Sequence, residues 1–126
     1  MKWCNRCKRY KHKEEFHRSR NAPDGLSYIC KVCNRNYRIA ATYDLTPDDY
    51  DQMLEDQNYS CSICKKETKD RNLAIDHHHG SGVVRSLLCT NCNSVIGFAL
   101  EDPEILENAA AYIRLWGEII DTIHLT

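Results

Sequence analysis

The eight cysteines of this chain fall into four Cys-x-x-Cys pairs, and this pattern constrains the fold more than any other feature. Taken in neighbouring couples, the pairs give C-x2-C-x22-C-x2-C and then C-x2-C-x24-C-x2-C. Two thiolates three positions apart can reach one tetrahedral Zn²⁺, and four complete a closed structural site. We therefore predict two Cys4 zinc sites in an approximate internal duplication. Their ligands are Cys4, Cys7, Cys30 and Cys33 in the first unit and Cys61, Cys64, Cys89 and Cys92 in the second.

The composition favours metal over disulfides as the source of stability. The chain has 126 residues, 28% of them charged, and a unit of ~40 residues usually needs a metal or disulfides to fold alone. The start, Met1-Lys2-Trp3-Cys4, leads into a cysteine pair without the apolar segment of a secretory signal. No stretch approaches the ~20 apolar residues that span a bilayer, so we expect no membrane partner. We expect a cytoplasmic protein whose cysteines bind metal; a secreted disulfide scaffold is the alternative.

Charge is distributed unevenly along the chain. The formal net charge is −1, yet residues 1–43 carry eleven Lys and Arg against three acids, a charge of +8, and the remainder carries six against fifteen, a charge of −9. Lys and Arg gain affinity for DNA by releasing counterions from the phosphate backbone. We expect the basic part to face DNA, a solvated surface being the alternative. The candidate contacts, taken as a group, are Arg6, Lys8, Arg9, Lys11, Arg18, Arg20, Lys31, Arg35 and Arg38.

The sequence predicts the same order of elements in both units: a cysteine knuckle, a β-hairpin and a helix, as in a treble-clef zinc unit. Turn residues and branched residues place these elements. They are strand 26–29 and helix 31–42 in the first unit, and strands 73–78 and 83–88 and helix 91–100 in the second. We predict a small α+β zinc-stabilised fold. Its expected domains are a DNA-binding zinc unit 1–43, a linking helix 44–58, a second zinc unit 59–100 and a C-terminal helix 101–126.

Two further helices follow from capping and periodicity. Thr46 is a suitable N-cap, Pro47 fits the first helical position, and Asp48 and Asp49 favour the positive end of the helix dipole. The C-terminal helix is predicted from about Pro103. It carries an apolar stripe that we expect to pack in the core, an intermolecular face being the alternative. The stripe consists of Ile105, Ala109, Tyr112, Ile113, Trp116, Ile120 and Ile123.

The stretch "DHHH", residues 76–79, belongs to the second unit alone. Asp76 and His77 lie thirteen and twelve residues before Cys89, whereas the same offsets from Cys30 give no aspartate. Zinc binding needs only the cysteines, so Asp76 and His77 have no structural role in this comparison. This favours a reaction centre held by a zinc scaffold.

The predicted path would bring the end of the first strand against the first turn of the following helix. Asp76 and Asn93 would then offer two oxygen ligands suited to Mg²⁺ or Mn²⁺ more than to zinc. His77 could take a proton from water near neutral pH, and a cation, a base and a basic flank suit phosphodiester hydrolysis. Neighbours in a regular strand point to opposite faces, so we expect the strand to break or twist between Asp76 and His77.

Two nearby residues have open roles. His78 is expected to be exposed or structural. Arg85 is either a phosphate clamp or the partner of an ion pair within the hairpin.

The segments "YDLTPDDYDQMLEDQ", "YSCSICKK" and "LAIDHHHGSGVVRSLLCTNCNSVIG" resemble the phage recombination endonuclease VII family, part of the wider HNH or His-Me finger nucleases with a ββα-metal core. The leading segment, "CNRCKRYKHKEEFHRSRNAPDGLSYICKVCNRNYR", is similar to zinc units that precede this core in related phage proteins. The resemblance covers residues 43–100 well and the first 38 less specifically. One departure is Ser86, which stands where the family usually has glycine.

The resemblance implies a ββα-metal nuclease core over residues 59–100. It implies that Asp76 and Asn93 bind the catalytic divalent cation, that His77 is the general base, and that His79 contacts or orients the scissile phosphate. The products would carry 5′-phosphate and 3′-hydroxyl ends. A phage protein of this kind would act on DNA in the host cytoplasm, with a homodimer or a phage-encoded protein as a further partner.

Two other functions compete with the endonuclease. The main alternative is a non-catalytic double zinc module that binds nucleic acid. The other is a zinc-built adaptor that binds proteins through its acidic C-terminal half. Metal-dependent cutting of DNA separates the endonuclease from both.

Overall fold

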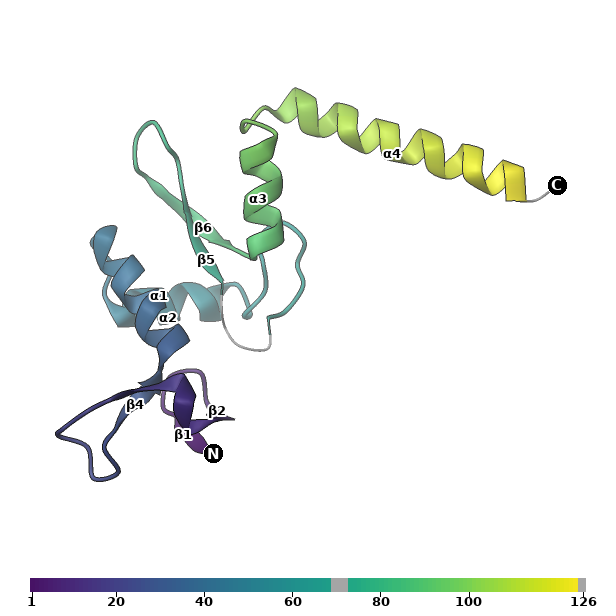
Figure 1. The fold of residues 1–126 in the computed structure, drawn as a ribbon. Coiled ribbons are helices and arrows are strands. Elements are labelled where there is room, and N and C mark those ends of the chain that lie inside the picture. The colour runs from purple at the N-terminus through teal and green to yellow at the C-terminus, as the bar shows by residue number, and fades with distance from the viewer. Residues whose placement is uncertain (69–72, 125–126) are drawn as a thin grey trace. The chain divides into compact units, whose positions relative to one another are not determined.

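The computed structural model describes residues 1–68 and 73–124 and divides into two compact units, Met1–Cys92 and Asn93–Thr126. The first unit holds three two-stranded antiparallel sheets and two complete helices. Helix α3 (Thr90–Phe98) begins in the first unit and continues into the second. The predicted α+β class, with two cysteine clusters and a C-terminal helix, is confirmed (Figure 1). The domain boundaries inferred from the sequence stay a prediction.

The N-terminal zinc unit consists of two small sheets and a helix. Strand β1 (Lys2–Cys4) pairs with β2 (Arg9–Lys11), and β3 (Phe16–Arg18) pairs with β4 (Leu26–Cys30) after a short 3-10 turn, η1 (Lys13–Glu15). Strand β4 leads directly into α1 (Lys31–Thr42). Four cysteines and Phe16 are the buried residues at its centre. A unit of this size has too small an apolar core to fold alone. A core made mostly of cysteines is therefore consistent with stabilisation by a bound metal.

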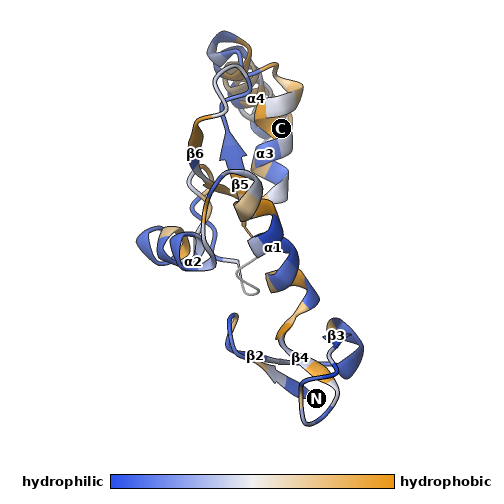
Figure 2. Ribbon diagram, turned by 90° about the vertical axis from the view of Figure 1, so that its left-hand side faces the viewer, coloured by the Kyte–Doolittle hydropathy of each residue, from blue (hydrophilic) through white to orange (hydrophobic). Residues whose placement is uncertain are grey.

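Helix α2 (Pro47–Asp56) connects the two zinc units. Thr46 caps it as predicted: its hydroxyl accepts from the N–H of Asp49, whose carboxylate accepts from the N–H of Thr46 in return. Figure 2 shows α1 and α2 as mostly hydrophilic with isolated hydrophobic residues. Tyr50 of α2 is 2% exposed and donates to the carbonyl of Leu73 at 2.6 Å. Its ring also meets that of Tyr37 edge to face, at 6.1 Å between centroids, so Tyr50 joins α1, α2 and the start of the second hairpin.

The second zinc unit contains the hairpin of β5 (Ala74–His77) and β6 (Val84–Leu88). Its base is fixed by Gln57 at the end of α2. The Gln57 side chain donates to the carbonyl of Leu87 at 3.0 Å and accepts from the N–H of Leu87 at 2.9 Å. The N–H of Ser62, beside Cys61 of the second cysteine cluster, also donates to the Leu87 carbonyl, at 3.2 Å. The cysteine knuckle and α2 thus hold the base of the hairpin together.

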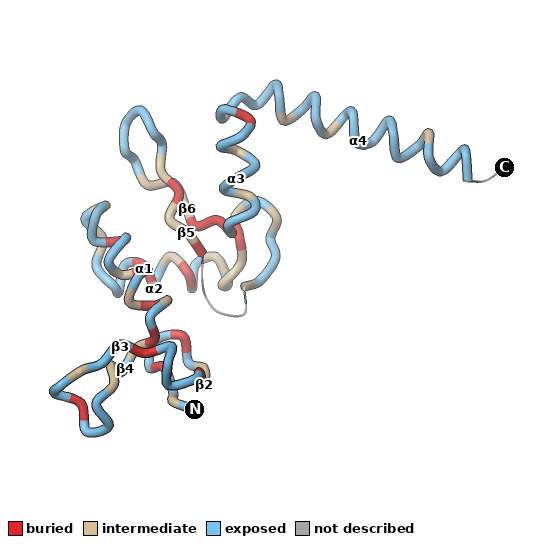
Figure 3. The backbone as a smooth tube through the Cα atoms, in the orientation of Figure 1, coloured by how far each residue is buried: buried red, intermediate tan, exposed pale blue. Residues whose placement is uncertain are grey.

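The apolar stripe of the C-terminal helix α4 (Pro103–His124) is not buried within its own unit, so its expected packing in the core stays a prediction. Within their own unit the larger members of the stripe are exposed, among them Tyr112 at 65% and Ile113 at 70%. Figure 3 shows α4 as exposed along almost its whole length. Helical spacing defines which side chains share a face, but it does not supply a partner for that face. Within residues 1–68 and 73–124, no helix is long and apolar enough to cross a membrane.

Candidate active site

The eight cysteines form the two predicted clusters. In each cluster the four Sγ atoms lie within 4.8 Å of one another. Sγ–Sγ distances of 3.8 Å between Cys4 and Cys33 and 3.9 Å between Cys64 and Cys89 match the edge of about 3.8 Å that Zn–S bonds of ~2.3 Å give a tetrahedron. The four thiol donors of each cluster and their spacing therefore fit a structural zinc ion in both cysteine clusters.

Backbone N–H groups prepare one thiolate in each cluster. Burial raises the pKa of the Cys4 thiol, but the N–H groups of Cys7, Cys30 and Arg6 outweigh it and lower the pKa to about 7. The N–H groups around Cys61 likewise outweigh burial and lower its pKa to about 6. Hydrogen bonds from N–H groups favour the charged form of a thiol.

In each cluster another thiol, Cys7 or Cys92, has a raised pKa. Burial, followed by the neighbouring thiol of Cys4, raises the pKa of Cys7 to about 11. Burial and the hydrogen bond with Cys89 raise the pKa of Cys92 to about 12. Four thiolates cannot share so small a volume without a counter-charge, so full ionisation of either cluster requires a bound cation.

The β5–β6 pairing is irregular at the Asp76–His77 step, as the sequence predicts. Asp76 lies opposite Ser86, whereas the next residue, His77, lies opposite Val84. Arg85 is therefore the extra residue of a β-bulge. The bulge lies on β6, opposite the Asp76–His77 step of β5. That Asp76 and His77 contribute to one site stays a prediction.

Asp76 forms an ion pair with Arg85 across the bulge. Its two carboxylate oxygens accept from Arg85 Nε at 2.6 Å and from Nη2 at 3.0 Å. Asp76 is buried, 7% exposed, while the Arg85 side chain is 38% exposed. Of the two roles considered for Arg85, the structure shows the ion pair within the hairpin. Carboxylate oxygens are also the ligands that a hard cation prefers.

His77 is held by a residue that sequence reasoning missed. Its Nδ1 lies 3.0 Å from the hydroxyl of Tyr43, which caps the C-terminal end of α1, and the two rings pack at 4.9 Å between centroids. The ring of His79 lies on His77 at the same centroid distance. Tyr43 is 34 residues away in the chain and no local periodicity marks it. The hairpin and α1 thus bring Tyr43, His77 and His79 together.

His78 has the structural role that was one of its two expectations. Its Nδ1 lies 2.9 Å from the hydroxyl of Ser81 and accepts from the N–H of Ser81 at 3.1 Å. A Cβ at Gly80 would come within 3.1 Å of the His78 ring, so this tight turn requires a glycine there. His78 therefore closes the tip of the hairpin.

Asn93, the other expected cation ligand, is the first residue of the second unit. It lies on α3, directly after the zinc ligand Cys92, and is exposed. Its approach to Asp76 stays a prediction.

The structure narrows the basic group expected to face DNA. Lys11 is buried at 8% exposure beside the cysteine cluster. Arg6 pairs with Asp51 at 3.0 Å and lies over the ring of Tyr37, so it fastens the knuckle to α1 and α2. Most of the other members are exposed: Lys8, Arg18, Arg20, Lys31, Arg35 and Arg38.

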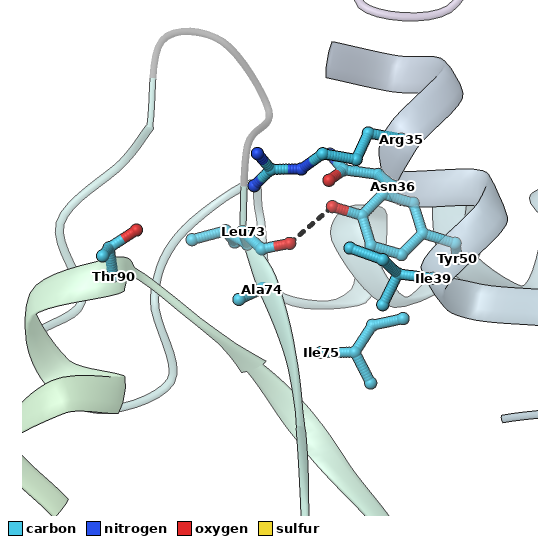
Figure 4. A pocket seen from close by; sticks show the side chains of 8 residues that line it. All are labelled: Arg35, Asn36, Ile39, Tyr50, Leu73, Ala74, Ile75 and Thr90. Atoms are coloured by element: carbon cyan, nitrogen blue, oxygen red, sulfur yellow. Dashed lines mark hydrogen bonds between the residues drawn. The ribbon is translucent and has the colours of Figure 1, made fainter. Parts of the chain in front are cut away.

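One of these exposed residues, Arg35, reaches the β5–β6 hairpin. A cavity of about 200 Å³ lies between α1, α2 and β5, and Arg35 of α1 extends along its rim above Leu73 (Figure 4). Ile75 lines the cavity, and Asp76 follows it in the strand. The positive surface of α1 therefore extends to β5, next to the bulge.

A family model and curated phage proteins match the part of the chain that contains these residues. The family model "Recombination endonuclease VII" matches residues 36–115, which include the bulged hairpin and the second cysteine cluster. The Gene 59 protein of Mycobacterium phage D29 is 42% identical over 79 residues, covering 61% of this chain and 48% of that protein. The Gene 59 protein of Mycobacterium phage L5 is 42% identical over 78 residues, covering 60% and 48%. The chain thus spans about half the length of the curated relatives it matches.

One solved structure is also similar. It is the ββα-Me type II restriction endonuclease Hpy99I, 24% identical, with a TM-score of 0.45 over 90% of this chain and 64% of that one. The family assignment depends on the sequence match, which covers more than half of the chain and contains Asp76, His77 and Asn93. This chain belongs to the recombination endonuclease VII family.

Proposed function

We propose that this chain is a metal-dependent endonuclease that hydrolyses phosphodiester bonds in DNA. The observation that supports the proposal is the irregular β5–β6 hairpin. In it a buried carboxylate, Asp76, directly precedes a histidine whose Nδ1 lies 3.0 Å from the Tyr43 hydroxyl. A pair of cysteine clusters holds the base of this hairpin and the helix that supplies Tyr43.

In the proposed mechanism, His77 is the general base. For Nε2 to accept a proton from water, Nδ1 must carry the ring's own proton and donate it to Tyr43 Oη. The water oxygen then forms a bond to phosphorus as the P–O3′ bond breaks, and the water proton passes to Nε2. The leaving 3′ oxygen gains a proton from solvent. The ends are a 5′-phosphate and a 3′-hydroxyl.

Asp76 and Asn93 are the proposed ligands of the divalent cation, Mg²⁺ or Mn²⁺. When bound, that cation would supply positive charge for the scissile phosphate and the leaving oxygen. His79, whose ring packs on His77, is proposed to orient the phosphate. The exposed cations of the N-terminal unit, with Arg35 nearest the hairpin, are proposed to bind the DNA backbone.

The test is conversion of supercoiled plasmid to nicked or linear DNA in Mg²⁺ or Mn²⁺. Loss of a general base typically costs roughly 10²- to 10⁴-fold in rate, so His77→Ala should abolish cutting while the protein stays folded and zinc-loaded. His124→Ala, on exposed α4, is the matched control and should cut normally. Normal cutting by His77→Ala would sink the proposal. DNA binding without cutting by the wild type would instead favour the non-catalytic zinc module.

A further inference from the structure

The Asp76–Arg85 ion pair poses a question for any cation site at Asp76. Both carboxylate oxygens are used in the pair, at 2.6 Å and 3.0 Å, and Asp76 is almost fully buried. A buried carboxylate needs a counter-charge, and Arg85 supplies it within the protein.

A divalent cation cannot simply be added to this arrangement. A carboxylate has spare lone pairs, so the number of contacts is not the obstacle. The obstacle is charge, since a cation at about 2 Å from the carboxylate would lie within about 4–5 Å of the guanidinium. At that separation, in a partly buried site, like charges repel strongly.

We propose that Arg85 and the divalent cation compete for Asp76, so that Arg85 must leave the carboxylate before the cation binds. This inference rests on the proposed function, because it takes Asp76 to be the cation ligand. Arg85 is the extra residue of the bulge and its side chain is 38% exposed, so its guanidinium can turn toward solvent without unpairing the strand. Only molecules in which the ion pair is open can then bind the cation. The apparent association constant is therefore the intrinsic constant multiplied by the fraction of such molecules.

Binding of Mn²⁺ alone to zinc-loaded protein tests the competition without any cleavage assay. Hydrogen bonds to a charged group typically correspond to a factor of roughly ten to a hundred in an equilibrium. We therefore expect Arg85→Met to bind Mn²⁺ about ten to a hundred times more tightly than the wild type, measured by calorimetry or by electron paramagnetic resonance. Arg114→Met, on exposed α4, is the matched control and should bind like the wild type. Asp76→Asn should lose this binding with or without Arg85.

Thermal unfolding gives a second readout. Without Arg85 the buried carboxylate has lost its counter-charge, so the Tm of Arg85→Met should fall, and Mn²⁺ should raise it by more than it raises that of the wild type. If Arg85→Met does not fold, Arg85→Lys replaces it in both measurements, because lysine cannot form the two-pronged contact.

The two ideas fail in different ways. If the wild type binds Mn²⁺ through Asp76 and the Arg85 variant binds no more tightly, the competition is refuted and the proposed function stands. If folded, zinc-loaded wild type and variant both fail to bind Mn²⁺, the cation site and the competition are refuted together.

Discussion

Replacing Tyr43 by phenylalanine removes one atom from the proposed site and leaves the ring in place. That atom, Oη, lies 3.0 Å from His77 Nδ1, and the ring packing at 4.9 Å should persist. In the proposed mechanism the hydroxyl accepts from Nδ1–H and so favours the tautomer with Nε2 unprotonated. A net hydrogen bond is typically equivalent to about 0.5–1.5 kcal/mol. If the tautomer with Nε2 unprotonated loses that much, kcat should fall roughly three- to tenfold, with KM unchanged.

Two measurements on the same variant separate this role from a merely structural one. The kcat and KM for a DNA duplex are compared with those of Tyr10→Phe, an exposed tyrosine in β2. ¹⁵N NMR of the His77 ring then reports the protonated nitrogen, which should shift from Nδ1 toward Nε2 in Tyr43→Phe and stay unchanged in the control. Wild-type kcat together with an unchanged tautomer would refute the reasoning.

Three further predictions concern stability and zinc. Tyr50→Phe removes the hydroxyl that donates to the Leu73 carbonyl at 2.6 Å and should lower the free energy of unfolding by about 1–2 kcal/mol in urea titrations; an unchanged midpoint would contradict it. Thr46→Ala removes the hydroxyl that accepts from the Asp49 N–H at the α2 cap and leaves the backbone N–H that donates to the Asp49 carboxylate. It should cost about 1 kcal/mol, against no change for an exposed control such as Ser94→Ala. Zinc affinity should rise between pH 6.5 and 8, because the raised pKa values of Cys7 and Cys92 mean that binding releases protons; a chelator competition independent of pH would be inconsistent with this.

Local chemistry predicted the scaffold well. Cysteine spacing gave both clusters, and the Thr46-Pro47 pair gave the start of α2, because ligand geometry and capping act over only a few residues. The irregular pairing of β5 with β6 at the Asp76–His77 step was also expected from the sequence.

The contacts of the site itself were harder to predict. Arg85 reaches Asp76 only because the bulge changes the pairing register, and Tyr43 meets His77 only because α1 packs against β5. Local sequence periodicity predicts neither the pairing register of two strands nor how a helix packs on them. For the same reason the sequence predicted where α4 lies in the chain but not what surrounds its apolar face. It also identified Lys11 as a basic residue but not that its side chain is buried.

The hairpin is anchored at one end only, which has a consequence for how such proteins diversify. Gln57, Ser62 and the cysteine knuckle fix the Leu87–Leu88 end, and the bulge follows within two residues. The opposite end, residues 78–83, is exposed and closed by its own hydrogen bonds. Insertions at residues 80–82, beyond His79, should leave the proposed reacting groups in place. The tip is therefore the position at which a longer loop could be grafted to reach a different DNA shape while the proposed catalytic residues are kept.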